Sequence, residues 1–183
     1  MATFQYYVAS TIDGFIASAD DDLGWLLQFD QVEGVNEGIE SFMAGVGCIA
    51  MGGDTYRWLL EHEPGAWPYP DLPSWVFTHH EYSAPAGANI TFVRGDVREF
   101  APDLIKDAGD KNVWLVGGGD LVAQFANAGL LDEMIVTIVP VVLGAGKRLL
   151  PLRGPTAPLE LVSHKTIGGA AAELHYRMPK GPA

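Results

Sequence analysis

Residues 113–125 read Val113-Trp114-Leu115-Val116-Gly117-Gly118-Gly119-Asp120-Leu121-Val122-Ala123-Gln124-Phe125, and this stretch decides the expected fold. Its first four residues are apolar or aromatic, which is typical of a strand buried on both faces. Apolar residues return at helical spacing after the three glycines, and Gly129 is a suitable helix stop. A strand, a glycine turn and a helix in this order expose the amide groups of the first helical turn. An anion, most often a phosphate, is the expected ligand there.

This glycine pattern does not match two well-known nucleotide-binding signatures. Val122 stands where the Rossmann fingerprint G-x-G-x-x-G has its third glycine. A second glycine-containing segment, residues 144–148, has Arg148 where a P-loop needs Ser or Thr. A glycine turn kept only for packing therefore stays open as an alternative to a phosphate site.

The composition limits the class of protein. The chain has 183 residues, 48% of them hydrophobic, which is enough for one domain with a full core. Its formal net charge of −12 argues against nucleic-acid binding, which requires a basic face. No apolar run approaches the roughly 20 residues of a membrane span, and no secretory signal is evident, so we expect a cytoplasmic protein with no membrane partner. The single cysteine, Cys48, is expected in the core.

The order of the expected elements predicts an α/β domain. Strands alternate with helices through the first two-thirds of the chain, and only strands follow. This order favours a mostly parallel sheet covered by helices and finished by an antiparallel C-terminal hairpin. The expected strands are residues 4–10, 48–51, 75–77, 90–93, 113–116 and 134–142, the hairpin is 159–167 with 172–176, and the expected helices are 32–44, 56–60, 97–108 and the one after the triple glycine.

Two further strand ends carry residues that suit a ligand. Gly52, Gly53 and Thr55 form a second glycine turn that enters a helix, and Thr78 and His79 follow the next strand. In an open α/β sheet, ligands gather at the carboxyl ends of the strands. Two glycine turns at helix N-termini suit a diphosphate better than a single phosphate. Together they favour a dinucleotide site.

Two carboxylates near the N-terminus have a structural and a functional interpretation each. Asp13 precedes a glycine and is a typical turn residue. Asp30 follows Trp25 by five residues and can cap the next helix. A carboxylate beside a flat aromatic ring can also bind and protonate a heterocycle. No metal site is expected, because the adjacent His79 and His80 point to opposite sides of an extended chain.

In combination, these segments resemble the dihydrofolate-reductase-like fold, and most of all the family of the C-terminal reductase domain of the riboflavin biosynthesis protein RibD. The resemblance covers nearly the whole chain, and its motifs are specific through their order and spacing. Residues 10–16, 51–56, 117–121, 130–133 and 140–146 are similar to the motifs S-x-D-G-x-I, M-G-R-x-T-Y, G-G-G-x-L, L-x-D-E and P-x-x-L-G-x-G, respectively.

The resemblance implies a single three-layer α/β/α domain over residues 1–180 and an NADPH-dependent reductase that forms a homodimer. Such an enzyme passes hydride to a pteridine- or aminopyrimidine-like heterocycle. Two enzymes serve as reference for this reaction: the 5-amino-6-(5-phosphoribosylamino)uracil reductase of riboflavin biosynthesis and dihydrofolate reductase. A non-catalytic nucleotide-binding module that kept the fold is the alternative. We also consider residues 134–143 as an interface strand.

The resemblance also implies roles for individual residues. Asp30 is the implied proton donor, with Asp13 as the alternative, and Trp25 contacts the substrate. The bond between Gly117 and Gly118 is implied to be cis. The implied cofactor-binding residues are Ala9, Ile16, Gly52, Gly53, Thr55, Thr78, His79, Gly117, Gly118, Gly119, Asp120, Leu121 and Val122.

Two departures from the motifs bear on the ligands. Gly53 replaces the arginine of M-G-R-x-T-Y, so NADH is an alternative cofactor, and Arg57 or His79 are candidates to compensate. Residues 14–16 lack the usual basic residue, and the acidic loop 20–22 follows. Because negative charge repels phosphate, a neutral or cationic heterocycle is expected as substrate rather than a phosphorylated one.

Overall fold

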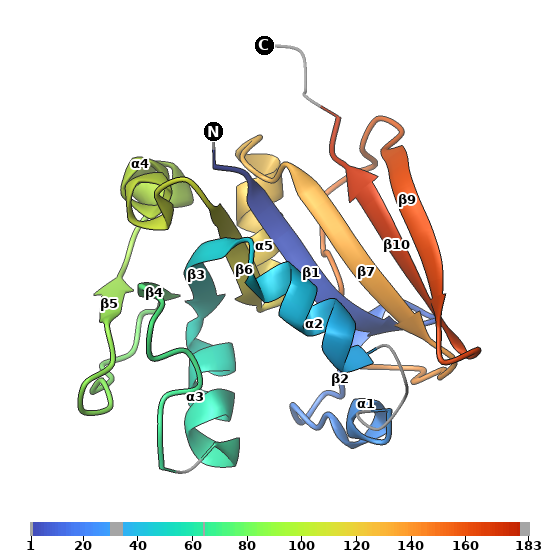
Figure 1. The fold of residues 1–183 in the computed structure, drawn as a ribbon, viewed down its shortest axis with the longest axis horizontal. Coiled ribbons are helices and arrows are strands. Elements are labelled where there is room, and N and C mark those ends of the chain that lie inside the picture. The colour runs from blue at the N-terminus through green and yellow to red at the C-terminus, as the bar shows by residue number, and fades with distance from the viewer. Residues whose placement is uncertain (1, 30–34, 64, 180–183) are drawn as a thin grey trace.

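A central twisted sheet with helices on both faces organises the computed structural model, which describes residues 2–29, 35–63 and 65–179 (Figure 1). Its strands are β1 (Phe4–Thr11), β3 (Val46–Gly52), β4 (Ser74–Phe77), β5 (Ile90–Val93), β6 (Asn112–Gly117), β7 (Glu133–Val139), β9 (Glu160–Ile167) and β10 (Ala171–Arg177). A separate two-stranded sheet joins β2 (Phe15–Ala17) to β8 (Lys147–Arg148). The helices are α1 (Gly24–Leu27), α2 (Val35–Met43), α3 (Gly53–His62), α4 (Val97–Ala108) and α5 (Gly119–Asn127).

The strand order confirms the predicted sheet. The order is β5-β4-β3-β6-β1-β7-β10-β9, and all neighbours from β5 to β7 run parallel. The last two strands form the antiparallel hairpin, with β10 paired to both β7 and β9. Because β7 is paired on both sides, residues 134–139 have no free strand edge with which to pair a second chain. The sheet ends instead at β5 and β9.

The side chains of β3 alternate between the two faces of the sheet, which explains why helices cover both faces and form a three-layer structure. Successive side chains of a strand point to opposite faces of the sheet. Cys48 and Ala50 pack into the core cluster that includes residues of α4 and α5. Ile49 and Met51 pack into the cluster that includes residues of α3 and the side chain of Trp67. These four side chains of β3 are fully buried, so both faces of the sheet centre are covered.

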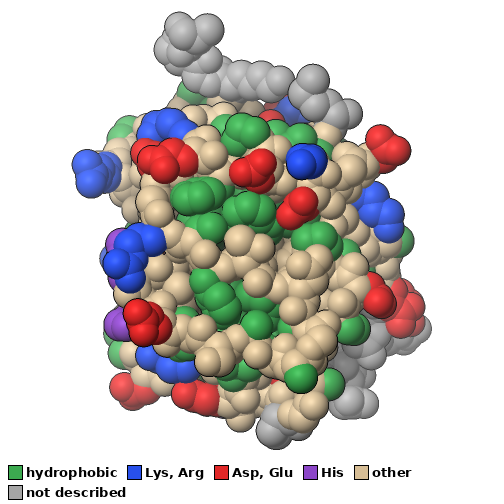
Figure 2. Space-filling model, turned by 90° about the vertical axis from the view of Figure 1, so that its left-hand side faces the viewer, with side chains coloured by type: hydrophobic (Ala, Val, Ile, Leu, Met, Phe, Trp, Pro, Cys, Tyr) green, Lys and Arg blue, Asp and Glu red, His purple; other side chains and the backbone are tan. Residues whose placement is uncertain are grey.

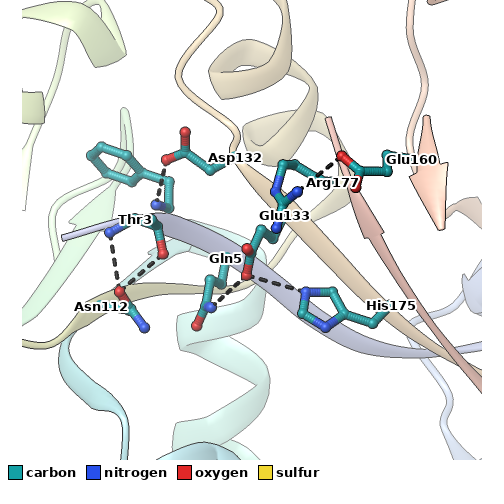
Figure 3. Close-up of polar contacts among 9 residues, drawn as sticks. Thr3, Gln5, Asn112, Asp132, Glu133, Glu160, His175 and Arg177 are labelled. Carbon is teal, nitrogen blue, oxygen red and sulfur yellow. Dashed lines mark hydrogen bonds and ion pairs between the residues drawn. The ribbon is translucent and has the colours of Figure 1, made fainter. Parts of the chain in front are cut away.

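Polar contacts fix the strands at the end of the sheet where β1, β6 and β7 begin (Figure 3). The Oδ1 atom of Asn112 accepts hydrogen bonds from the Thr3 amide at 3.1 Å and the Thr3 hydroxyl at 2.9 Å. The Oε2 atom of Glu133 accepts from Nε2 of Gln5 at 2.8 Å and lies 3.1 Å from Nε2 of His175. These contacts tie β6 to β1 and β7 to β1 and β10. The opposite, carboxyl end of the sheet is left for the candidate site.

Several element bounds differ from the sequence-based expectation, and two of them have a clear physical reason. Helix α3 begins at Gly53 rather than at residue 56, with Gly52 as N-cap and no side-chain cap. The glycine turn is therefore the helix start itself, since glycine is an accepted N-cap residue. Strand β7 ends at Val139 because Pro140 has no amide to donate to a sheet. Among the described residues, no helix is both long and apolar enough to span a membrane.

Candidate functional site

A cavity of about 660 Å³ lies at the carboxyl ends of the parallel strands. This volume falls within the range of about 300–1,000 Å³ that small-molecule sites occupy. Because β4, β3, β6 and β1 are parallel neighbours, their last residues meet at one edge of the sheet. The cavity is lined by almost all of the expected cofactor residues, namely Ala9, Ile16, Gly52, Gly53, Thr55, Thr78, His79, Gly117, Gly118, Gly119, Asp120 and Leu121.

Val122 is the expected cofactor residue that does not line the cavity. Its side chain is completely buried in the core cluster shared with α4. Helical periodicity turns the side chain of Val122 toward the sheet, whereas Asp120 is exposed and lines the cavity. The side chain of Val122 is therefore not accessible to a ligand in the cavity.

The two glycine turns lie side by side. Met51 of β3 pairs with Gly117 of β6, so the turns that follow these strands are neighbours. A Cβ atom placed on Gly117 or Gly118 would lie 3.6 or 3.8 Å from the hydroxyl oxygen of Thr55 in α3. The N-termini of α3 and α5 therefore converge on one wall of the cavity. Both helix ends direct partial positive charge toward it.

The start of α5 leaves amide groups free for an anion. The N-cap Gly118 provides no side-chain acceptor, and the amides of Leu121 and Val122 donate to its carbonyl oxygen at 3.0 and 3.2 Å. Among the residues that the structure describes, none accepts a hydrogen bond from the amides of Gly119 or Asp120. Unpaired amides at a helix N-terminus are typical anion ligands.

Two positions of this turn require glycine for different reasons, one because of its backbone conformation and the other because of its packing. Gly118 has a φ of +70°, which side chains other than glycine rarely adopt. Gly119 is required by packing, because a Cβ there would collide with the carbonyl oxygen of Arg148. The implied cis bond between Gly117 and Gly118 is wrong: all described peptide bonds are trans. The trans form is favoured by about 2.5–4 kcal/mol for bonds that do not precede proline.

Four charged side chains pair with one another beside the cavity, and three of them, Asp21, Asp54 and Lys147, line it. The Nζ atom of Lys147 lies 2.5 Å from Asp21 and 3.4 Å from Asp54. The Nη2 atom of Arg57 lies 3.5 and 3.3 Å from the same two carboxylates. Burial alone lowers the pKa of Lys147, but the hydrogen bonds and charges of Asp21 and Asp54 raise it above its usual value overall. Both cations are thus neutralised within this charged quartet.

Asp13 binds a neighbouring loop and does not line the cavity. Its carboxylate accepts hydrogen bonds from the Thr11 hydroxyl at 2.6 Å, the Leu143 amide at 3.1 Å and the Gly144 amide at 2.7 Å. The hydrogen bond from Thr11, with those from the two amides, lowers the pKa of Asp13 to about 2. A carboxylate held in its ionised form is a poor proton donor. The geometry therefore favours the turn-forming interpretation of Asp13.

Trp25 packs into the core next to the cavity. Its side chain is only 9% exposed and contacts the cluster that contains Val139, Ile167 and Ala171. The flanking Leu23 and Leu26 line the cavity instead. The indole nitrogen of Trp25 has no hydrogen-bond partner among the described residues. Asp30, the expected proton donor, lies outside the described residues.

The cavity also contains residues that the sequence analysis did not identify. They include Trp58 of α3, Arg94 after β5, Gln124 of α5 and the pair Lys147 and Arg148 of β8. Arg94 follows a strand as Thr78 does, so the rule that ligands gather at strand carboxyl ends could have found it. Lys147 and Arg148 carry no such local signal. Within the described part of the chain, no three His, Cys, Asp or Glu side chains are grouped to hold a metal ion.

Comparisons of sequence relate the chain to known proteins. Residues 69–172 match the family model of the RibD C-terminal domain. The uncharacterized protein YwjB of Bacillus subtilis (strain 168) is 35% identical over 170 residues, which cover 93% of this chain and 94% of the relative. The uncharacterized protein YyaP of the same strain is 27% identical over 177 residues, which cover 92% and 91%.

Solved structures share the fold. A protein from Shewanella sp. PV-4 named for riboflavin biosynthesis is 24% identical with a TM-score of 0.80, over 97% of this chain and 99% of the other. The deaminase and 5-amino-6-(5-phosphoribosylamino)uracil reductase of Thermotoga maritima has a TM-score of 0.72 at 14% identity, over 97% and 57%. Dihydrofolate reductase from Enterococcus faecalis, complexed with NADP(H), has a TM-score of 0.65 at 12% identity, over 96% of both chains.

The structural role of Asp13 can be tested through pH. The pKa of Asp13 is about 2 in the folded chain against an ordinary value of 3.8, so its stabilising effect is present above about pH 4 and is lost as the pH falls toward 2. We expect Asp13→Asn to lower the Tm at pH 7, and the difference from the wild type to shrink below pH 4, measured by circular dichroism. Asp20→Asn, in an exposed neighbouring loop, is the control. An unchanged Tm together with lost turnover would instead support a catalytic Asp13.

Proposed function

The chain belongs to the RibD C-terminal domain family, and from that premise we propose that it is an NADPH-dependent reductase. The observation that carries the proposal is the cavity of about 660 Å³ on which two glycine turns open at helix N-termini. Unpaired amides and two aligned helix dipoles favour a pyrophosphate there. Because the chain carries a net charge of −12, such local groups have to hold an anionic cofactor.

The residues that line the cavity suit a nicotinamide dinucleotide that extends along the strand ends, with each part of the cofactor next to a different strand. The pyrophosphate lies between the turns at residues 52–53 and 117–119. The nicotinamide lies toward Ala9 and Ile16, and the adenosine lies toward Thr78 and His79. When bound, the reduced nicotinamide supplies a hydride. The chain holds the two reactants in contact and excludes water from them.

The substrate we propose is a pteridine- or aminopyrimidine-like heterocycle without a phosphate group. Beyond Ile16 the cavity is lined by Leu23, Leu26 and Trp58. Apolar and aromatic walls suit a flat heterocyclic ring. The charged quartet beside this wall pairs both of its cations with carboxylates, and Arg148 is the cavity-lining cation of β8 that has no carboxylate within 4.0 Å among the described residues. The acidic loop 20–22 and the paired quartet favour the substrate of a dihydrofolate-reductase-like reaction over the phosphorylated riboflavin precursor.

We infer a homodimer that forms through the outer edge of β9. Within the described ranges, this strand pairs only with β10 and ends the sheet. Its Leu161 and Val162 side chains are 48% and 41% exposed. An unpaired edge with exposed apolar side chains is a template for pairing with another strand. The proposed cytoplasmic location remains a prediction.

Cofactor binding can be tested with two glycines of equal φ. Gly118 and Gly129 both have a φ of +70°, but only Gly118 lines the cavity. Alanine at either position is strained, because side chains other than glycine rarely adopt this positive φ. We expect Gly118→Ala to raise the Kd for NADPH about tenfold or more, and Gly129→Ala to leave it within about twofold, by calorimetry. Absence of NADPH and NADH binding to the wild type at millimolar concentration would contradict the proposal.

The proton donor can be tested with Asp30→Asn. A general acid contributes about 10²- to 10⁴-fold to the rate, so kcat with a pterin or aminopyrimidine substrate is expected to fall by about 10²-fold or more. The Kd for the cofactor is expected to stay unchanged, because the carboxylate acts on the substrate. Unchanged kcat would make Asp30 a structural residue. Cofactor binding by the wild type without turnover of any tested heterocycle would favour the non-catalytic module.

The homodimer can be tested by light scattering. The expected mass of the wild type is twice the 19.7 kDa of one chain. Changing both Leu161 and Val162 to Lys is expected to give monomers, because charged side chains on an edge strand block pairing. Val142→Lys is the control, since Val142 is 70% exposed and lies outside β9. A monomeric wild type, or dimers in the double variant, would contradict an interface at β9.

A further inference from the structure

We propose that a side cavity of about 280 Å³, next to the proposed substrate site, rejects substrates that carry an anionic tail. This inference rests on the proposed function, because it names the charge that a substituent of the heterocycle can have. The side cavity lies between the loop 20–22 and helix α3. Asp21 and Trp58 line both the main cavity and the side cavity, so the two are neighbours at the substrate end.

The proposed positions of the two reactants direct a substituent of the substrate toward the side cavity. The cofactor occupies the strand ends, and the heterocyclic ring lies against Leu23, Leu26 and Trp58. Because the ring has to present one face to the nicotinamide, its substituent extends away from the strand ends and past Trp58. The indole of Trp58 stacks on the imidazole of His62, with ring centroids 4.2 Å apart. Since His62 lines the side cavity, this aromatic wall leads from one cavity into the other.

Carboxylates dominate the lining of the side cavity. They belong to Asp20, Asp21, Asp22 and Glu61. The guanidinium of Arg57 also lines it, but this cation is neutralised, because its Nη2 atom lies 3.5 Å from Asp21 and 3.3 Å from Asp54. Among the described residues, no cation lies within 4.0 Å of the carboxylates at positions 20, 22 and 61. Excess negative charge therefore lines the path of the substituent.

The cation of the substrate end that has no carboxylate partner lies off this path. Arg148 lines the main cavity but not the side cavity. Its guanidinium carbon lies 5.9 Å from the centre of the Phe15 ring, and Phe15 lines neither cavity. Such a distance is typical of a cation–π contact. Within the described part of the chain, the side cavity thus has no Lys or Arg to offer to an anionic group.

The surface of the molecule has the same charge pattern. Figure 2 shows Asp and Glu side chains around a Lys or Arg side chain at the lower margin of its face, the end at which α1 and α3 lie in Figure 1. Like charges across a binding surface slow association and lower affinity. A dihydrofolate, whose p-aminobenzoyl-glutamate tail has two carboxylates, is therefore rejected although its ring suits the main cavity. The substrate is a heterocycle with a neutral or positively charged substituent.

The test compares three pteridines for binding to the 183-residue chain saturated with NADP⁺, which has no hydride to transfer. They are 6-hydroxymethyl-7,8-dihydropterin, 7,8-dihydrofolate and the dimethyl ester of 7,8-dihydrofolate, which keeps the tail but removes its charge. We expect the Kd of dihydrofolate, by calorimetry at about 0.05 M salt, to exceed that of its ester about tenfold or more. At about 0.5 M salt the difference is expected to shrink below about threefold, because salt screens exposed charges.

A charge-reversal variant locates the effect. Changing both Asp20 and Glu61 to Lys is expected to tighten dihydrofolate binding about tenfold or more and to leave the Kd of the ester within about twofold. The matched control changes Asp103 and Asp110 to Lys. These two exposed residues lie on and just after α4, which covers the other face of the sheet, and the change in net charge is the same. The control is expected to keep the wild-type ratio of the two Kd values, and circular dichroism verifies the fold of both variants.

The outcomes separate this inference from the reductase proposal. Equal Kd values for dihydrofolate and its ester, tighter binding of dihydrofolate, or a difference that salt does not change would overturn the role of the side cavity and leave the reductase proposal intact. These comparisons use the wild type and need no variant to fold. An equal effect of the control variant would also overturn it, since net charge alone would then decide. Binding of none of the three pteridines would overturn both proposals, whereas binding without hydride transfer from NADPH would overturn only the reductase.

Discussion

The parallel pairing of β3 with β6 is the constraint on which the site depends. This pairing sets Met51 opposite Gly117, so the two strands end together and the helices α3 and α5 begin side by side. Neither helix start has a side-chain cap. A register shift in this pairing would separate the glycine turns and send strand side chains to the wrong face. The packing of both sheet faces by helices therefore also secures the geometry of the anion site.

Cations beside the cavity have two kinds of partner. At the β1 and β8 end, the quartet of Asp21, Asp54, Arg57 and Lys147 balances two carboxylates against two cations. Arg148 of β8 and Arg94 after β5 also line the cavity, and neither has a carboxylate within 4.0 Å among the described residues. Cations without a carboxylate partner in the described chain therefore lie at both ends of the cavity.

Local sequence signals predict elements better than they predict the direction of side chains. The bounds of α4 agree with the periodicity of residues 97–108, because Asp96 caps its start and Gly109, with a φ of +62°, ends it. The glycine turns were likewise found from the chain alone. Val122 lies in the same segment, yet its side chain is buried against the sheet. One residue along a helix is enough to separate a cavity wall from the core.

The sequence by itself determined the strand–glycine–helix units, the order of the elements and the residues at the strand ends, because all of these depend on contacts within a few positions. Only the tertiary structure decided which distant polar groups form hydrogen bonds with one another. Asp13 contacts the amides of Leu143 and Gly144, which are 130 and 131 positions away, and Arg94 reaches the carbonyl oxygen of His79 from another strand. Such partners are brought together by strand pairing and packing, for which a single stretch of sequence contains no signal.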